Sequence, residues 1–531
     1  MVQRLRPRGP SPLSSRTAAP ATARSTDRWS ARGIASVALP GALVLILATV
    51  IATRTPLWRD EIASLSFAQL PLPDLLSAVG HVDAVLAPYY LLSSAGQAVL
   101  PGAVGLRLPS VLAAALTATV VAVIARRWWG DAAALAAGIM VGLNPLSLQL
   151  AATGRPYALA TLFVALALLA MTTATGPRGA PRRDVLPWAG YAAAVAAAGL
   201  MHLFALLALP AFAVLAASRR VLGRWLLASA AAVTVVVPVA LLAASQSAQV
   251  AWIPRPDPRS AAGTLASTLT YRREGAFERP ELVAVAILLV VGVVTVTLTL
   301  RMPRPARARE LALLACSLTL ACGPWAILLA ISVTATPYLR TTYLAPGVIG
   351  WGLLVGAAAA RLGTWQSGRS AVRRAVAIIV VAAPVVSAAA FSAPVLAQEW
   401  RVDDFPGLAQ RLSGEVAAGD TMLVVQLYNE VGVASGVARA GGDEGWVSAL
   451  QSDLTTGTQP VISVRRVDSA DPLHTTAKED GDTERAWVIY TRGAFTPGEA
   501  RRALADSGCG DAMLGPEESF GILRLIPARC P

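Results

Sequence analysis

The feature that most constrains this chain is a series of long apolar runs that begins near residue 34 and stops at residue 394. About eleven of these runs approach or reach the length that crosses the roughly 30 Å hydrocarbon layer of a membrane as a helix. The composition agrees, because 55% of the residues are hydrophobic and 15% are charged, against roughly 25% charged in soluble domains. We therefore predict a polytopic α-helical membrane protein.

The short loops between the runs indicate their orientation, because cytoplasmic loops are enriched in Lys and Arg. The predicted spans are 34–52, 106–125, 132–150, 157–173, 186–201, 203–218, 224–243, 281–300, 311–333, 341–360 and 375–394. When they alternate from a cytoplasmic N-terminus, every loop placed inside holds at least two arginines, beginning with Arg126 and Arg127. We predict a multi-pass protein of the plasma (inner) membrane with its C-terminal segment outside the cytoplasm.

The formal net charge of +13 has the same explanation. The basic residues form short clusters between apolar runs and do not line one face, so topology accounts for them better than a nucleic-acid partner does. Membrane lipid is the expected surrounding, and no nucleic acid is expected.

Three regions follow from this pattern. Residues 1–33 are rich in Arg, Pro and Ser without an apolar period, which predicts a disordered basic cytoplasmic tail. Residues 34–394 form the transmembrane domain, including a long first outside loop at 53–105. Residues 395–531 alternate helix and strand candidates, which predicts a small extracytoplasmic α/β domain.

Two of the four cysteines fall in the C-terminal domain and flank its last strand candidate. Cys509 and Cys530 are expected to form a disulfide if this domain is outside the cytoplasm. Cys316 and Cys322 lie within one apolar span, where small apolar residues of a helix are the favoured reading.

Candidate polar residues gather in the first outside loop. Asp60 and Glu61 directly follow the first span, where ionisable groups at the membrane boundary are often functional; a helix N-terminus or a solvated surface pair is the alternative. Further on, His81 and Asp83 could contribute to a divalent metal site or orient a polar ligand. One His and one Asp do not establish a metal site.

Two arginines stand at the outside mouths of spans, against the topological bias. Arg155 and Tyr157 open the fourth span, and Arg340 and Tyr343 open the tenth. A guanidinium group suits a phosphate well, and snorkelling to lipid headgroups is the alternative.

These residues, in this order, resemble the GT-C type, family 39-like glycosyltransferases of bacteria, which use polyprenyl-phosphate sugars and include the actinobacterial mannosyltransferase-like enzymes. The resemblance covers essentially the whole chain. It rests on the motifs WRDE at 58–61, HVD and PYYLL at 81–92, GLRLPS at 105–110, GRPYAL at 154–159, RTTYLAP at 340–346 and WRVDDF at 400–405.

The resemblance implies an inverting transfer of a sugar, with mannose expected, from a polyprenyl-phosphate donor to an extracytoplasmic glycan, lipid or protein. Asp60 would be the catalytic base that deprotonates the acceptor, with Glu61 beside it. The donor phosphate would be bound by Arg155, Tyr157, Arg340 and Tyr343. His81 and Asp83 would place a divalent metal (Mg²⁺ or Mn²⁺) or the acceptor. Asp60, His81, Asp83, Arg155 and Arg340 are expected to converge on one cavity at the outside rim.

The sequence departs from the family at two places. A second His after the HVD run is replaced by Leu86 and its neighbours, and a Gln-Glu before the RPYA segment is replaced by Ala152, Thr153 and Gly154. These departures bear on metal dependence and on the acceptor.

Two other functions stay open at this point. A polytopic transporter or lipid flippase would show internal repeats and ionisable residues deep within the spans, whereas the charges here gather at one rim. A non-catalytic membrane scaffold would have no converging pocket there.

Overall fold

The computed structural model of the protein describes most of the transmembrane domain and parts of the C-terminal domain. The described residues are 30–55, 57–175, 185–250, 253–270, 277–365, 371–397, 404–413, 415, 420–425, 462–466, 485–491, 497–506, 509–521 and 523–530. The predicted basic tail lies outside them, apart from its last four residues.

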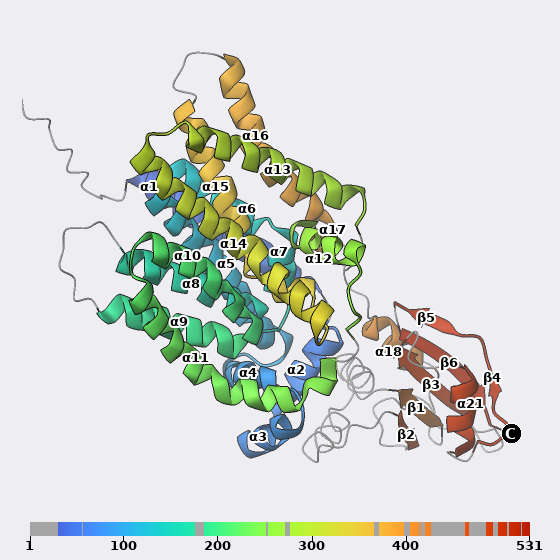
Figure 1. Ribbon diagram of the computed structural model, residues 1–531. Coiled ribbons are helices and arrows are strands. Elements are labelled where there is room, and N and C mark those ends of the chain that lie inside the picture. The colour runs from blue at the N-terminus through green and yellow to red at the C-terminus, as the bar shows by residue number, and fades with distance from the viewer. Residues whose placement is uncertain are drawn as a thin grey trace, which may run out of the picture.

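Helices, most of them long, make up the transmembrane part (Figure 1). They are α1 (Ala31–Arg54), α5 (Gly102–Trp129), α6 (Asp131–Gly142), α7 (Pro145–Ala151), α8 (Tyr157–Ala174), α9 (Val185–Met201), α10 (Leu209–Ser218), α11 (Leu222–Ser245), α12 (Pro258–Thr270), α13 (Arg279–Leu300), α14 (Arg304–Thr334), α15 (Gly347–Trp365), α16 (Ala371–Phe391) and α17 (Ala393–Leu396). Short 3-10 helices η2 (Leu203–Ala208), η3 (Ser247–Val250) and η4 (Thr341–Leu344) connect some of them.

These helices confirm the polytopic fold predicted from the sequence. Seven described helices are long and apolar enough to cross a membrane, and the bent pair α6–α7 makes an eighth candidate. Three shorter apolar helices cover 185–201, 203–218 and 347–363. Together these segments correspond to the eleven predicted spans.

Small residues allow the helices to approach closely. A Cβ atom at Gly41 of α1 would collide with Thr119 of α5, and one at Gly350 of α15 would collide with the backbone of Ser317 in α14. Hydrophobicity does not drive helix association in lipid, so such close contacts and their dispersion energy hold a transmembrane bundle together.

The break between α6 and α7 shapes one end of the bundle. The two helices meet at 62°. Asn144 caps α7 by accepting a hydrogen bond from the Ser147 amide at 3.1 Å, and its own amide donates to the Thr268 carbonyl at 2.8 Å. Pro145, at the first position of α7, disfavours continuation of the preceding helix. The bend directs α7 into the loop that carries Arg155.

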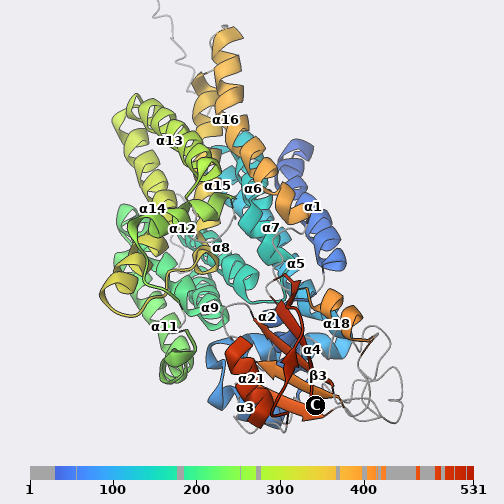
Figure 2. The same cartoon turned by 90° about the vertical axis from the view of Figure 1, so that its right-hand side faces the viewer.

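The segment 53–105, which is predicted to be the first outside loop, folds into helices at this end of the bundle. They are α2 (Arg59–Gln69), α3 (Leu72–His81), η1 (Ala84–Leu86) and α4 (Ala87–Val99). Figures 1 and 2 show α2, α3 and α4 at the end where the C-terminal domain also lies, and we call this the rim end. The predicted interfacial helix near 88–100 corresponds to α4.

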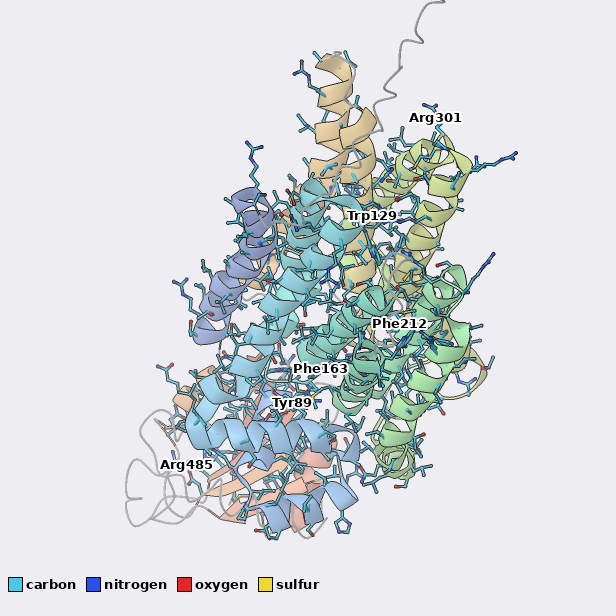
Figure 3. All side chains as sticks on the ribbon, turned by 90° about the vertical axis from the view of Figure 1, so that its left-hand side faces the viewer. Tyr89, Trp129, Phe163, Phe212, Arg301 and Arg485 are labelled. Carbon is cyan, nitrogen blue, oxygen red and sulfur yellow. A yellow bond between two sulfur atoms is a disulfide. The ribbon has the colours of Figure 1, made fainter. Side chains whose placement is uncertain are left out.

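One arginine-rich loop and the C-terminal domain lie at opposite ends of the protein. Figure 3 shows Arg301, from a loop predicted inside, far from Arg485 in the C-terminal domain. The alternation predicted from the arginines is therefore consistent with the fold, and which end faces the cytoplasm stays a prediction.

The C-terminal domain contains a six-stranded sheet with the order β2-β1-β3-β6-β4, and β5 pairs with β6. The strands are β1 (Thr421–Val425), β2 (Ile462–Arg466), β3 (Arg485–Thr491), β4 (Met513–Leu514), β5 (Glu518–Phe520) and β6 (Leu523–Arg529), and the helices are α18 (Phe405–Ser413) and α21 (Pro497–Asp506). β1 and β3 are parallel, and the other pairs are antiparallel.

Side chains alternate between the two faces of this sheet, as the pleat requires. Val488 and Ile526 pack with Leu504 of α21 on one face. Trp487 and Leu525 on the other face belong to the same continuous apolar cluster as the transmembrane core. The domain is therefore packed onto the bundle.

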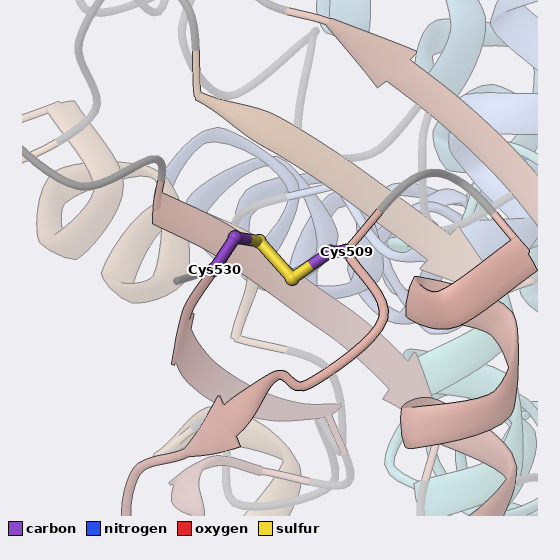
Figure 4. The surroundings of a disulfide bond; sticks show 2 residues. All are labelled: Cys509 and Cys530. Carbon is purple, nitrogen blue, oxygen red and sulfur yellow. A yellow bond between two sulfur atoms is a disulfide. The ribbon is translucent and has the colours of Figure 1, made fainter.

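Cys509 and Cys530, the two cysteines expected to pair, are joined by a disulfide with a Cα–Cα distance of 5.2 Å (Figure 4). The bond ties the segment after α21 to the end of β6. Cys316 is a buried free thiol, and Cys322 is free and half-buried.

Candidate active site

The candidate site is built on the first turn of α2, which begins directly after Trp58. Asp60 and Glu61 both lie in this turn, where the helix dipole stabilises carboxylates. Consecutive residues of a helix point about 100° apart, so the two side chains face different surroundings. The side chain of Asp60 is 36% exposed, whereas Glu61 is fully buried.

Glu61 forms a buried ion pair with Arg107 of α5. The Nε and Nη2 atoms of Arg107 each donate to one Glu61 oxygen at 2.7 Å, and Arg107 is 2% exposed. The amide of Gly154 also donates to Glu61 at 2.7 Å. Glu61 therefore joins α2 and α5 to the loop before Arg155. These contacts suit a positioning role, and the catalytic role that the resemblance implies for Glu61 stays a prediction.

Arg155 lies beside Asp60. Its Nη2 atom is 3.8 Å from an Asp60 carboxylate oxygen, and its Nη1 atom donates to the Ser64 hydroxyl at 3.2 Å. The Arg155 carbonyl accepts a hydrogen bond from Ser110 at 3.1 Å. Its Nε atom is buried without a hydrogen-bond partner among the described residues. Asp60 and Ser64 of α2 therefore hold the guanidinium, and Ser110 of α5 holds the Arg155 backbone.

Asp83 faces the same guanidinium from the other side of the first outside loop. It has a left-handed backbone conformation, with φ 56°, and accepts a hydrogen bond from the Tyr90 hydroxyl at 2.9 Å. Burial raises the pKa of Asp83, while the charge of Arg155 and the Tyr90 hydrogen bond oppose that rise. Burial alone would lower the pKa of Arg155, but the charges of Asp60, Tyr157, Tyr90 and Asp83 raise it.

Aromatic rings from three separate segments extend the site. The Tyr157 ring at the start of α8 lies 5.1 Å from the His202 ring, which follows α9, and 6.3 Å from the Tyr343 ring of η4. His202 and Tyr343 are 4.9 Å apart. Burial, and then the charge of Arg155, lower the pKa of His202 to about 3. This imidazole is therefore neutral at physiological pH.

The structure brings together most of the residues that the sequence singled out. Asp60, Asp83, Arg155 and Tyr157 act electrostatically on one another, and Tyr343 joins them through its ring contacts. Arg340 immediately precedes η4, and its carbonyl accepts the Tyr343 amide at 3.2 Å.

His81 does not join this group. It is exposed at the end of α3, and no described interaction connects it to Asp60, Asp83 or Arg155. The expectation that it would place a metal or the acceptor stays a prediction, and these contacts do not support it.

Arg107 and His202 were missed in the sequence, although both carried a signal. Arg107 belongs to the GLRLPS motif, and a buried glutamate such as Glu61 requires a cation. His202 is one of three histidines in the chain and lies between two apolar runs. Neither signal indicates which distant segment the side chain will meet.

The divalent metal that the resemblance implies stays a prediction. Arg155 lies 3.8 Å from Asp60 and its charge acts on Asp83, while His81 is exposed at the end of α3. Among the described residues, no group of three or more His, Cys, Asp or Glu side chains could hold a metal ion. A structural magnesium or manganese ion would need oxygen ligands that converge.

Comparison with known proteins places this geometry in context. Residues 89–245 match the sequence model of the dolichyl-phosphate-mannose-protein mannosyltransferase family. This stretch is less than a third of the chain, and it includes Tyr90, Arg107, Arg155, Tyr157 and His202. No curated protein sequence matches the chain at a significant level.

Two solved structures share the fold. The crystal structure of ArnT from Cupriavidus metallidurans bound to undecaprenyl phosphate has a TM-score of 0.51 and 15% identity, and the match covers 93% of this chain and 98% of that chain. The apo structure of the same protein has a TM-score of 0.50 and 15% identity, with 92% and 97% coverage. The likeness shows a GT-C type fold with a small C-terminal sheet domain, as the sequence predicts.

Proposed function

We propose that this chain is a membrane glycosyltransferase that moves a sugar from a polyprenyl-phosphate carrier to an extracytoplasmic acceptor, with mannose as the expected sugar. The observation that carries the proposal is the meeting of Asp60 and Arg155 at the rim end, 3.8 Å apart, from segments 95 positions apart in sequence. A partly exposed carboxylate beside a fixed guanidinium meets the two needs of such a transfer, a proton acceptor and an anion site.

The reaction follows from these two groups. The acceptor hydroxyl attacks the anomeric carbon, the bond from that carbon to the phosphate oxygen breaks, and the acceptor proton passes to the Asp60 carboxylate. The leaving polyprenyl phosphate takes the electron pair and gains negative charge, which Arg155 stabilises. Attack opposite the leaving group inverts the anomeric configuration. The charge of Asp83, which accepts a hydrogen bond from Tyr90, also acts on this guanidinium.

The two alternatives are less well supported. A transporter would place ionisable residues along a path through the bundle, whereas this cluster stays at the rim end. A scaffold would not require a buried carboxylate, Glu61, to fix the loop that carries Arg155.

The test uses membranes that contain the full chain and a radiolabelled polyprenyl-phosphate mannose. We expect label to move into a product only when the protein is present, and a parallel series with other polyprenyl-phosphate sugars would identify the donor. Label that crosses the membrane without changing its covalent attachment would support a flippase. Absence of both transfer and transport with every donor would contradict the proposal.

Substitution of Arg155 by alanine is expected to raise the KM for the lipid-linked donor about 10- to 100-fold, because hydrogen bonds to charged groups contribute about 1.5–3 kcal/mol. The KM for the acceptor should change much less. Initial rates at varied donor concentration measure this. Arg259→Ala is the control, since Arg259 is an exposed arginine of α12 at the first turn; an equal effect of both variants would argue against a specific donor site.

Replacement of His202 by phenylalanine is expected to raise the donor KM about tenfold, because the ring contacts stay while the imidazole N–H is lost. The matched control is His81→Phe, which changes an exposed histidine of the first outside loop. If His202→Phe had the donor KM of the wild type, the imidazole would have no part in donor binding.

The orientation of the chain is open to a direct measurement. Alkaline phosphatase fused after Ala397 is expected to be active, because the loops that are rich in arginine then lie in the cytoplasm. A green fluorescent protein fused at the same point should be dark if it is exported through the general secretion route. An inactive phosphatase together with a bright fluorescent protein would reverse the topology.

A further inference from the structure

An open apolar groove runs along the surface of the bundle between α8 and α9, with a volume of about 620 Å³. This size is within the range of about 300–1,000 Å³ that is typical of small-ligand sites. The α8 side presents Phe163 and Leu169, and the α9 side presents Gly190 and Ala197. The groove is separate from the candidate active site, since it contains none of that site's residues.

The length of the groove corresponds to one leaflet of a bilayer. It extends along α8 from Phe163 to Thr173, and the ten steps between these residues span about 15 Å at 1.5 Å per residue. The hydrocarbon layer is about 30 Å thick. Figure 3 shows Phe163 between Tyr89, at the rim end, and Trp129, toward the opposite end. The groove therefore runs along the surface from the middle of the bundle toward the end opposite the rim.

The side chain of Arg127 lies at the end of the groove where a lipid headgroup would be. Arg127 lies two residues before the end of α5 and lines this end of the groove. It is exposed and donates to the Thr173 hydroxyl at 2.8 Å. Its neighbour Arg126 forms an ion pair with Asp131 at 2.7 Å. Arg127 has no acidic partner within the part of the chain that the structure describes. Its charge is therefore open to an anion.

We propose that this groove binds an acyl chain of an anionic phospholipid, with the lipid phosphate against Arg127. The occupant is argued from the apolar lining, the length of one leaflet and a cation at the headgroup level. α8 begins at Tyr157, two residues after Arg155, so the lipid would lie along the helix whose other end carries the candidate donor site. The proposal does not depend on the proposed enzyme activity.

Two variants test the binding of the acyl chain and the binding of the lipid headgroup separately. Gly190→Phe fills the groove, and it should fold because a Cβ at Gly190 meets no atom within 4 Å. Arg127→Gln removes the cation and leaves the apolar lining intact. Arg126→Gln is the matched control, since it changes the neighbouring arginine, whose charge is already paired.

The experiment measures lipid retention by the purified full-length protein in detergent, using native mass spectrometry with added phosphatidylglycerol or phosphatidylcholine. The wild type and Arg126→Gln are expected to retain phosphatidylglycerol at least fivefold more than phosphatidylcholine. Gly190→Phe should lose retention of both lipids, and Arg127→Gln should lose the preference. Equal retention of the two lipids by the wild type, or unchanged retention by both groove variants, would overturn the proposal. So would a wild-type dimer that Gly190→Phe converts to a monomer, because a second copy would then fill the groove.

Discussion

Asp60→Asn is expected to reduce sugar transfer by about 10²- to 10⁴-fold, the range over which positioned general bases contribute to catalysis. The amide keeps the size and the hydrogen-bonding geometry of the carboxylate but cannot accept the acceptor proton. Folding should be retained, because the side chain is 36% exposed and its contact with Arg155 is long at 3.8 Å.

The measurement is the rate of label transfer from the lipid-linked donor, normalised to folded protein on size-exclusion chromatography. Asp74→Asn is the matched control, since Asp74 is an exposed carboxylate in the first turn of α3, in the same outside loop. A folded Asp60→Asn protein with an undiminished rate would show that Asp60 is an ordinary loop charge. Loss of the same size in Asp74→Asn would indicate a general effect on the loop.

Glu61→Gln is expected to destabilise the protein by about 3–5 kcal/mol, because removal of one partner of a buried ion pair leaves the other charge uncompensated. Arg107 would stay buried at 2% exposure, with the carbonyls of Ala52 and Thr55, each at 2.6 Å, among its remaining acceptors. The Gly154 amide would also lose its carboxylate acceptor. Glu61 and Asp60 are adjacent, yet substitution of Glu61 should act on stability and substitution of Asp60 on chemistry.

This difference can be measured as the apparent melting temperature in detergent. The readout is the fraction of protein that stays monodisperse after heating. Asp131→Asn provides the comparison, because it breaks the Arg126–Asp131 pair, in which Asp131 is 45% exposed, and exposed pairs contribute about 1 kcal/mol or less. If Glu61→Gln melted with the wild type while transfer was lost, Glu61 would act in catalysis and the positioning role would be wrong.

Local patterns in the sequence determined the architecture. Apolar runs of membrane length predict spans because the hydrocarbon layer fixes the length that a helix must have, and each predicted run corresponds to an apolar segment of the bundle. Helix and strand candidates that alternate in the last segment predict the small α/β domain, and β3 and β6 lie in it. Cys509 and Cys530 could be paired because no other cysteine lies in the last 137 residues.

The sequence motifs predicted most residues of the candidate site, but the tertiary structure decided which partner each side chain meets. Asp60 and Glu61 have the same charge and adjacent positions, but the helical turn directs one to the rim and the other to Arg107. His81 and Asp83 are two positions apart, and the left-handed backbone at Asp83 separates an exposed imidazole from a carboxylate that faces Arg155. His202 meets Tyr157 and Tyr343 only after three distant segments pack together. Sequence periodicity reports which residues are apolar over a few turns, whereas the partner of a polar side chain depends on contacts between segments that are far apart in the chain.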